Sequence, residues 1–354
     1  MRIAVYGAGA IGGSLGGFLA SAGEDVLLVD QWHEHVAAMQ RQGLVLEGIT
    51  GEQRASVTAI HSSQLGEVGG VFDVVVVAVK SYDTVAAVHA MLPYMHDETW
   101  VVTPQNGLNE LQIGPLVGAR RVLGCVTTIA AELVEPARVR RTMRTGSDTK
   151  GGGDQPVCFI VAELDGRITP RLERLAALLQ PAGRTVTTTE LWAERWTKLA
   201  INAMVNPMAA ATGLAGYDLK ANDRARHLLY RLGIETVKVA RALGYRAEVP
   251  VGGFTLQDFE QAVAGSHAKL DEAFIGVRPT VPGRPSMGQD VLKGRPTEIR
   301  YINGEVAAHG VRIGVPTPCC DAAVEVVTRI ERGELTSSVD NIALLESLAG
   351  APAG

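Results

Sequence analysis

The chain opens with Met1-Arg-Ile-Ala-Val-Tyr6-Gly7-Ala8-Gly9-Ala10-Ile11-Gly12-Gly13, the stretch that decides the fold of its N-terminal part. An apolar run leads directly into Gly-x-Gly-x-x-Gly, and a helical segment from Ser14 to Ala22 follows. In such a unit the first glycine allows a tight turn, the second lets backbone N–H groups approach a pyrophosphate, and the third lets the helix pack on the strand. The helix N-terminus adds partial positive charge. The stretch predicts a dinucleotide site; a glycine-rich turn without a ligand is the alternative. The expected cofactor-binding residues here are Gly7, Ala8, Gly9, Ala10, Ile11 and Gly12.

An acidic residue follows at the position expected to bind the adenosine ribose. The apolar run Asp25–Val29 ends in Asp30, which lies 18 residues after Gly12, close to the roughly 20 typical of this motif. Because a carboxylate accepts from ribose hydroxyls and repels a 2′-phosphate, Asp30 favours NAD(H). Arg41 is the nearest downstream arginine that would favour NADP(H) instead. A strand-end aspartate that caps the following turn is the alternative role for Asp30.

Length and composition limit the remaining classes of protein. A chain of 354 residues predicts two domains. The net charge of −5 argues against nucleic acid as a partner, and we expect the one basic cluster, Arg138–Arg144, to form an exposed strand edge. The four cysteines lack metal-ligand and disulfide spacing, so we expect no metal and treat Cys319 and Cys320 as packing residues. Without a signal peptide or an apolar run of about 18 residues, we expect no membrane partner and a cytoplasmic location.

The order of the segments predicts an α/β domain followed by an all-α domain. Up to about residue 128, uniformly apolar runs alternate with helical segments, as in a doubly wound parallel sheet. Further short strands, a glycine-rich loop at 144–155 that we expect to be mobile, and a helix at 169–179 complete this part. Helical periodicity dominates from Leu191 onward. We therefore predict a Rossmann domain at 1–190, a helical domain at 191–335 and an extension at 336–354, with residues 351–354 disordered.

A second informative stretch is Trp196-Thr-Lys198-Leu-Ala-Ile-Asn202-Ala-Met-Val-Asn206-Pro207. Lys198, Asn202 and Asn206 recur every four residues, which places them within roughly 80° on one helix face. Their neighbours are apolar, and polar groups are expensive to bury unless they meet a polar partner. Pro207 should kink the helix and free a carbonyl. The stretch predicts a pocket wall for a small, oxygen-rich ligand; a lysine that extends along the surface to water is the alternative.

Taken together, the chain resembles the ketopantoate reductase family over residues 1 to about 330. Five separated motifs carry the resemblance: the glycine motif; Val79-Lys80-Ser81; Gln105-Asn106-Gly107; Trp196 to Pro207; and Ser286-Met-Gly-Gln-Asp290 with Thr297-Glu298-Ile-x-x-Ile-Asn303-Gly304. The resemblance implies a Rossmann-type domain, a helical domain like the C-terminal domain of 6-phosphogluconate dehydrogenase, and an active site in the cleft between them. It also implies reduction of 2-dehydropantoate to (R)-pantoate with NADPH, in pantothenate biosynthesis. Nothing in the sequence decides the oligomeric state, for which a homodimer is the candidate.

The resemblance also implies roles for individual residues. Lys198 matches the catalytic lysine, whose ammonium would polarise the 2-oxo group and donate a proton as an alkoxide develops. Asn106 matches a residue that binds substrate and nicotinamide ribose, and Lys80 one that contacts the cofactor. Asn202, Asn206, Ser286 and, more weakly, Asp290 are candidates for binding substrate, with helix-end N–H groups at Ser286 as a further aid. Glu298 would orient the substrate hydroxyl, tune Lys198 and approach the cofactor. The alternatives are a turn asparagine, a loop lysine, an N-cap serine, a surface aspartate and a capping-box glutamate.

Three functional interpretations remain open. The leading one is a 2-oxo-acid reductase of ketopantoate type that transfers hydride directly. The second is an NAD-dependent dehydrogenase of another hydroxy acid or alcohol, which Asp30 favours. The third is a non-catalytic nucleotide-sensing protein, which the presence of Lys198, Asn106, Ser286 and Glu298 disfavours.

Overall fold

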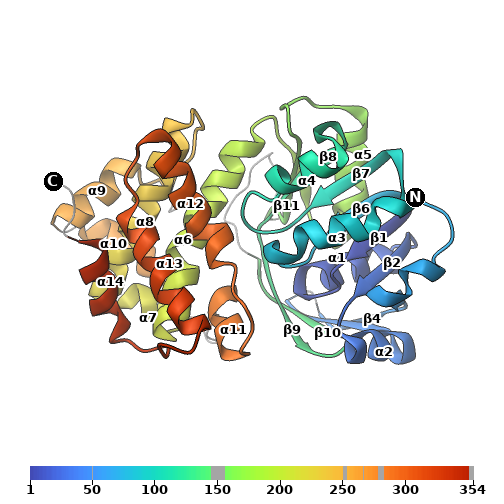
Figure 1. Ribbon diagram of the computed structural model, residues 1–354, viewed down its shortest axis with the longest axis horizontal. Helices are drawn as coiled ribbons and strands as arrows, with labels where there is room; N and C mark the ends of the chain where they lie inside the picture. Colours follow the sequence, from blue (N-terminus) through green and yellow to red (C-terminus); the bar gives the residue numbers. More distant parts are fainter. Residues whose placement is uncertain (50, 145–155, 250–252, 266, 278–282, 351–354) are drawn as a thin grey trace. The chain divides into compact units, whose positions relative to one another are not determined.

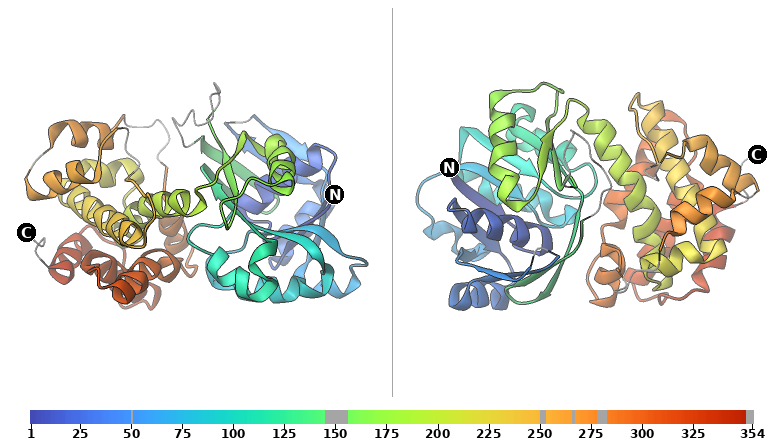
Figure 2. Two further views of the ribbon diagram at one scale, coloured as in Figure 1. Left: turned by 90° about the horizontal axis from the view of Figure 1, so that it is seen from above. Right: turned by 180° about the vertical axis from the view of Figure 1, so that it is seen from behind.

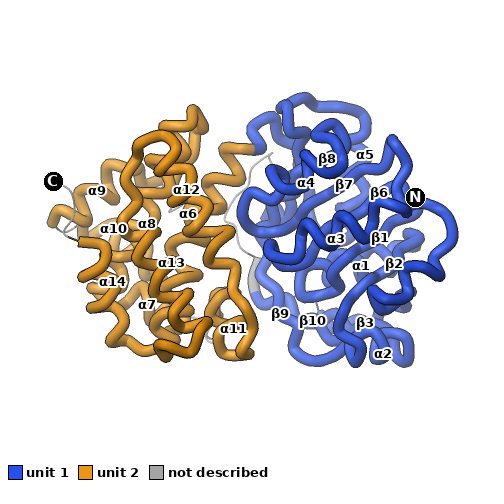
Figure 3. The backbone as a smooth tube through the Cα atoms, viewed as in Figure 1, with its two compact units in different colours: residues 1–191 blue, residues 192–354 orange. Residues whose placement is uncertain are grey.

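The computed structural model of the protein divides into two compact units, residues 1–191 and 192–354 (Figure 3). It describes residues 1–49, 51–144, 156–249, 253–265, 267–277 and 283–350. The expectation of a mobile loop lies outside these ranges except for Arg144, and so does the expectation of a disordered tail at 351–354. The two units are described separately.

The first unit is built around an eight-stranded sheet (Figure 1). Its strands follow the order β12 (Thr185–Thr187), β11 (Phe159–Glu163), β8 (Val122–Thr127), β7 (Met95–Thr103), β6 (Phe72–Val77), β1 (Arg2–Tyr6), β2 (Asp25–Asp30), β5 (Thr58–His61). From β5 to β8 neighbouring strands are parallel, whereas β11 is antiparallel to β8. Numbered along the chain, the parallel strands read third, second, first, fourth, fifth, sixth, which is the order of a doubly wound dinucleotide-binding fold. The predicted fold class of this part is confirmed.

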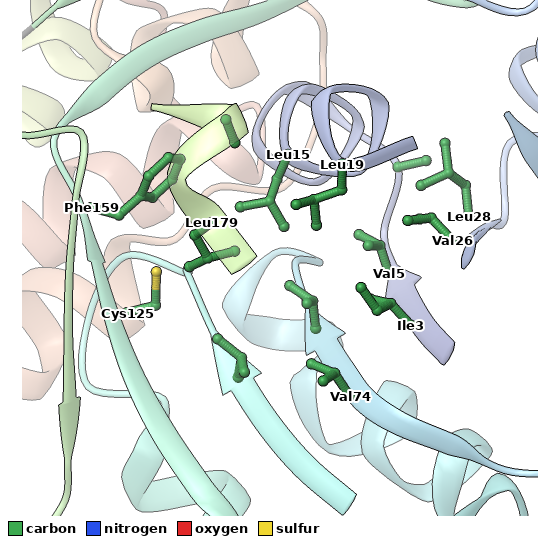
Figure 4. Packing of buried hydrophobic residues seen from close by; sticks show 14 of the residues in the cluster. Ile3, Val5, Leu15, Leu19, Val26, Leu28, Val74, Cys125, Phe159 and Leu179 are labelled. Carbon is green, nitrogen blue, oxygen red and sulfur yellow. The ribbon is translucent and has the colours of Figure 1, made fainter. Parts of the chain in front are cut away.

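Helices cover both faces of this sheet (Figures 1 and 2). They are α1 (Ala10–Ser21), α2 (His33–Gln42), α3 (Thr84–Met91), α4 (Glu110–Val117) and α5 (Pro170–Leu179). Because successive strand residues face opposite ways, Ile3 and Val5 join one buried cluster with α1, α2 and α5. Ala4 between them joins a second cluster with α3 and α4. Figure 4 shows Leu15 and Leu19 of α1 beside the strand residues of the first cluster.

A smaller sheet in the first unit corrects one expectation. Its order is β4 (Gln53–Ala55), β3 (Leu44–Gly48), β10 (Arg138–Arg144), β9 (Ile129–Glu135). β10 lies between β3 and β9, so the prediction of an exposed strand edge at Arg138–Arg144 is wrong. Arg138 and Arg140 form ion pairs with Glu47 of β3, and Arg141 is buried with its Nε donating to Ser14 Oγ at 2.8 Å. These arginines have partners within the protein, which explains why a basic strand lies inside a sheet.

The described residues of the second unit form helices joined by loops, without a strand. Its helices are α6 (Leu191–Thr212, which starts at the end of the first unit), α7 (Gly216–Ala221), α8 (Asp223–Ala242), α9 (Leu256–Ala264), α10 (Ala268–Ile275), α11 (Ser286–Leu292), α12 (Ile299–Ile313), α13 (Pro318–Glu331) and α14 (Asn341–Ala349). The all-α prediction for this part is confirmed. The expected extension contains α14, which packs on α13 and α8. Within the described ranges, no helix combines the length and apolarity needed to cross a membrane.

Candidate active site

The loop Gly7-Ala8-Gly9 joins β1 to α1 and uses its glycines in different ways. Gly7 has a φ of +98°, and a Cβ there would lie 2.7 Å from the backbone nitrogen of Val79. A Cβ on Gly12 would lie 1.9 Å from the Gly7 carbonyl oxygen, whereas one on Gly9 would meet nothing within 4 Å. The packing of the protein therefore leaves no room for a side chain at Gly7 or Gly12. At Gly9, the N-cap of α1, the space that a side chain would fill is open. That open space fits the pyrophosphate of a dinucleotide.

Asp30 at the end of β2 contacts the same loop. Its Oδ2 accepts from the backbone N–H of Ala8 at 2.8 Å, and its Oδ1 accepts from the N–H of Trp32 at 2.8 Å. The bond to Trp32 is the turn-capping role considered above. Each carboxylate oxygen has a further lone pair, so a ribose hydroxyl can still donate to Asp30. Arg41 lies in the last turn of α2, eight residues beyond His33 and about 12 Å from it along the helix axis.

Lys80 and Asn106 follow the neighbouring parallel strands β6 and β7, so both belong to the carboxyl edge of the sheet. Two buried amides hold the backbone around them. Gln105 Nε2 donates to the Val79 carbonyl at 2.7 Å, directly before Lys80. Asn109 Nδ2 donates to Ser81 Oγ at 3.1 Å, directly after Lys80, and to the Asn106 carbonyl at 2.6 Å.

Thr84 connects these two amides. Its hydroxyl accepts from Gln105 Nε2 at 2.8 Å and donates to Asn109 Oδ1 at 3.2 Å. No role was predicted for Gln105 from the sequence, and Asn109 was not among the predicted site residues. The available signal was a group of amides around Gly107 immediately after a buried strand.

Lys198, Asn202 and Asn206 lie on α6, as their spacing predicts. Both asparagines are buried and Lys198 is half-buried. Withdrawal of its ammonium from water lowers the pKa of Lys198 to about 8. Burial is the cause of this shift, and the suggested tuning of Lys198 by Glu298 stays a prediction.

The carbonyl freed by Pro207 has a partner. α6 continues through Pro207 to Thr212, and the residue four positions earlier, Ala203, lacks a helical donor because proline has no N–H. Asn303 Nδ2 of α12 donates to the Ala203 carbonyl at 3.0 Å. The buried Asn303 therefore links α12 to α6 at a position between Asn202 and Asn206. Sequence reasoning quoted Asn303 in a motif without assigning this role.

We expect Asn303→Ala to lower the free energy of unfolding by about 1–3 kcal/mol, because it leaves a buried carbonyl without a donor. In a Pro207→Ala background, residue 207 supplies that N–H, and the loss should be smaller. Chemical unfolding of the four proteins measures the difference. Equal losses in the two backgrounds would show that Asn303 acts through another contact.

The other predicted substrate residues lie on helices next to α6. Gly288 of α11 faces α6, since a Cβ there would lie 3.1 Å from the Ala209 Cβ. Ser286 is the first residue of α11 and Pro285 fills the N-cap, so Ser286 is not a capping serine. α11 is only seven residues long, so we assign no anion site to its N-terminus. Asp290 is buried rather than on the surface, and Glu298 is a buried N-cap of α12 whose side chain makes no capping bond.

The adjacent cysteines are packing residues, as expected. Both are buried at the start of α13, and the Glu235 carboxylate of α8 accepts from the Cys319 N–H at 2.8 Å and from the Cys320 N–H at 2.9 Å. Burial, and then the charge of Glu235, raise the pKa of the Cys320 thiol. A thiol that stays protonated is a poor nucleophile.

Comparison with known proteins identifies the class. The protein-family model described as ketopantoate reductase PanE/ApbA matches residues 3–153 of this chain. The family model for the C-terminal part of ketopantoate reductase PanE/ApbA matches residues 190–331. With the fold and the lysine–amide stripe, these matches define an oxidoreductase that acts on a CH–OH group. The chain belongs to the ketopantoate reductase family.

Individual relatives span nearly the whole chain. The 2-dehydropantoate 2-reductase of Pyrococcus horikoshii is 29% identical over 90% of this chain and 93% of its own length. That of Mesorhizobium japonicum is also 29% identical, over 94% and 99%. Among solved structures, D-mandelate dehydrogenase with NADH and anilino(oxo)acetate has a TM-score of 0.75 and 25% identity, covering 94% of this chain and 99% of that one. A PanE/ApbA family ketopantoate reductase from Ralstonia eutropha has a TM-score of 0.74, 27% identity and the same coverage.

Proposed function

We propose that this protein reduces 2-dehydropantoate, or a closely related 2-oxo acid, to the (R)-2-hydroxy acid with a nicotinamide dinucleotide. The observation that carries the proposal is Lys198, a desolvated ammonium with a pKa of about 8 on a stripe with two buried amides. In this proposal residues 1–190 bind the dinucleotide and residues 191–335 bind the substrate. A homodimer and a cytoplasmic location are further parts of the proposal.

The proposed mechanism assigns the proton to Lys198. A bound nicotinamide supplies the hydride. Lys198 polarises the 2-oxo group and transfers its proton to the oxygen as negative charge develops there. A pKa of about 8 keeps the ammonium mostly protonated at neutral pH while making it a stronger acid than an ordinary lysine.

The remaining candidates orient the reactants. Asn202 and Asn206 bind the carboxylate or hydroxyl end of the substrate, together with Ser286 and Asp290, and Glu298 orients its hydroxyl. The dinucleotide is held by the glycine loop, Asp30, Lys80 and Asn106.

An NAD-dependent dehydrogenase of another hydroxy acid is the second candidate function. Asp30 favours NAD(H), and D-mandelate dehydrogenase, solved with NADH, is similar to this chain over almost its whole length. The two candidates share the chemistry at Lys198 and differ in coenzyme, substrate side chain and direction.

Initial rates with 2-dehydropantoate, measured with NADH and NADPH side by side, test the proposal. Turnover with either coenzyme supports it and identifies the carrier. Dinucleotide binding without turnover would exclude this substrate. Mandelate and other aromatic or branched hydroxy acids, with their 2-oxo counterparts, would then test the second candidate.

Coenzyme preference should change when Asp30 is replaced. We expect Asp30→Ala to raise the NADPH-to-NADH ratio of kcat/KM about tenfold, since a carboxylate near a phosphate costs on the order of 1 kcal/mol or more. The variant also loses the bond to Ala8, but that loss weakens both coenzymes alike, so the ratio isolates the ribose contact. Glu34→Ala, an exposed charge deletion on the same segment, is the control. An unchanged ratio would mean that Asp30 serves the loop alone.

A further inference from the structure

Two side chains from the β2–α2 segment form hydrogen bonds with the backbone of Ala8 in the glycine loop, one with its N–H and one with its carbonyl. Asp30 Oδ2 accepts from the Ala8 N–H at 2.8 Å. On the other side of the residue, His35 Nε2 lies 2.9 Å from the Ala8 carbonyl oxygen. His35 is fully buried in the first turn of α2. The glycine loop therefore has side-chain partners on two consecutive peptide planes.

The second nitrogen of His35 fixes its tautomer. The Ala137 N–H donates to His35 Nδ1 at 2.9 Å. Because a backbone N–H can only donate, Nδ1 carries no proton, and Nε2 carries the proton that it donates to the Ala8 carbonyl. Ala137 lies in the turn between β9 and β10 with a φ of +57°. One imidazole thus connects the glycine loop with the turn of the smaller sheet.

The ring of His35 is also held in place. Trp32 stacks on it, with ring centroids 5.6 Å apart and planes 21° from parallel. The Trp32 N–H donates to Asp30 Oδ1 at 2.8 Å. Asp30, Ala8, His35 and Trp32 therefore form a closed circuit of contacts around the start of the loop.

The planarity of the peptide bond carries this restraint to the cofactor side. The Ala8 carbonyl and the Gly9 N–H belong to one trans peptide and point in opposite directions. When His35 binds the carbonyl, the Gly9 N–H is turned away from the imidazole. Gly9 is the N-cap of α1 and the residue beside the open space described above. The direction of the first N–H group at this helix end therefore depends on His35.

We propose that His35 is a positioning residue for the dinucleotide, which fixes the Ala8–Gly9 peptide so that the N-terminus of α1 is ready to bind the pyrophosphate. The inference rests on the dinucleotide site of the proposed function. His35 acts through the backbone, and its effect falls on binding rather than on proton transfer by Lys198.

Two substitutions of His35 each keep one of its two hydrogen bonds and remove the other. A glutamine places its amide near the position of Nε2 and can still donate to Ala8, whereas an asparagine places its amide near Nδ1 and can still accept from Ala137. We expect His35→Asn to raise the Kd of NADH, NADPH and ADP-ribose about 10- to 100-fold, the cost of one or two imperfect buried hydrogen bonds. We expect His35→Gln to bind within about threefold of the wild type. His89→Asn, at an exposed histidine in the last turn of α3, is the control.

Binding is measured by ligand fluorescence or calorimetry, with thermal unfolding of the free proteins and kcat at saturating dinucleotide alongside. If His35 positions the glycine loop, His35→Asn should bind the dinucleotide weakly, while its kcat at saturating dinucleotide stays within about threefold of the wild type. A purely structural role in holding the β9–β10 turn predicts the reverse order of the two variants. Equal, wild-type Kd values for both variants overturn the inference alone. A wild-type protein that binds none of the three ligands overturns the proposed function together with it.

Discussion

We expect Lys198→Met to lower turnover of the 2-oxo acid by roughly 10²- to 10⁴-fold, the usual contribution of a positioned general acid, and to leave dinucleotide binding nearly unchanged. Methionine is unbranched and only one atom shorter than lysine, but it has no proton to give. Rates and dinucleotide Kd values for the wild type, Lys198→Met and the exposed control Lys269→Met measure the effect. A variant with wild-type turnover would remove Lys198 from the mechanism.

The pKa of Lys198 sets the pH dependence of the same reaction. The rate of reduction should fall as the pH rises through about 8, where Lys198 loses its proton, and the rate of oxidation should rise. Lys198→Met should lack this inflection in kcat.

Stability should respond in the opposite sense to activity. Since the folded-state pKa lies below the 10.5 of an ordinary lysine, the unfolded chain binds more protons between about pH 8 and 10.5, and the wild type gains stability as the pH rises through that window. Below pH 8, Lys198 is charged in both the folded and the unfolded chain, and the whole cost of withdrawing its ammonium from water lowers the stability of the fold. Lys198→Met should therefore unfold at a higher temperature than the wild type, most clearly at neutral pH.

Gly9→Ala should keep its stability and bind the dinucleotide much more weakly, whereas Gly12→Ala should be strongly destabilised. A methyl group on Gly9 meets no atom within 4 Å, and the φ of −65° suits alanine. In the proposed complex that methyl would occupy the space of the pyrophosphate, and we expect the dinucleotide Kd to rise about 100-fold or more, which corresponds to about 2.7 kcal/mol.

At Gly12 the added Cβ would stand 1.9 Å from a backbone oxygen. Relief requires the loop or α1 to move, which we expect to cost about 3 kcal/mol or more. Thermal unfolding without ligand, followed by dinucleotide titration, distinguishes the two variants. Wild-type affinity in Gly9→Ala would place the dinucleotide elsewhere, and a stable Gly12→Ala protein would show that α1 can shift at little cost.

The parts of the fold that sequence reasoning predicted are those with local signals. The glycine motif specifies one strand, one turn and one helix within a few residues. The stripe of Lys198, Asn202 and Asn206 follows from helical periodicity alone. Even the carbonyl freed by Pro207 is a local consequence of proline chemistry, although its partner is not.

What the sequence did not reveal depends on contacts between distant residues. Arg138 is 91 residues from Glu47, its ion-pair partner on the neighbouring strand β3. His35 is 27 residues from Ala8 and 102 from Ala137, and no motif or spacing marks it. Gln105 and Asn109 act on the backbone of a loop that precedes them by more than 20 residues. Such supports become visible only when the topology brings the segments together.

The two hydrogen bonds that Asp30 accepts from the backbone make it difficult to change the coenzyme preference by substitution of Asp30. The carboxylate that would select the ribose also holds the Ala8 N–H and the turn at Trp32, so a single substitution that admits a 2′-phosphate also loosens the loop that must bind it. An evolving or engineered lineage would pass through an intermediate that is worse with either coenzyme. The easier route leaves Asp30 in place and adds a cation at Gln31 or His33, and coenzyme design on this scaffold should start from those two positions.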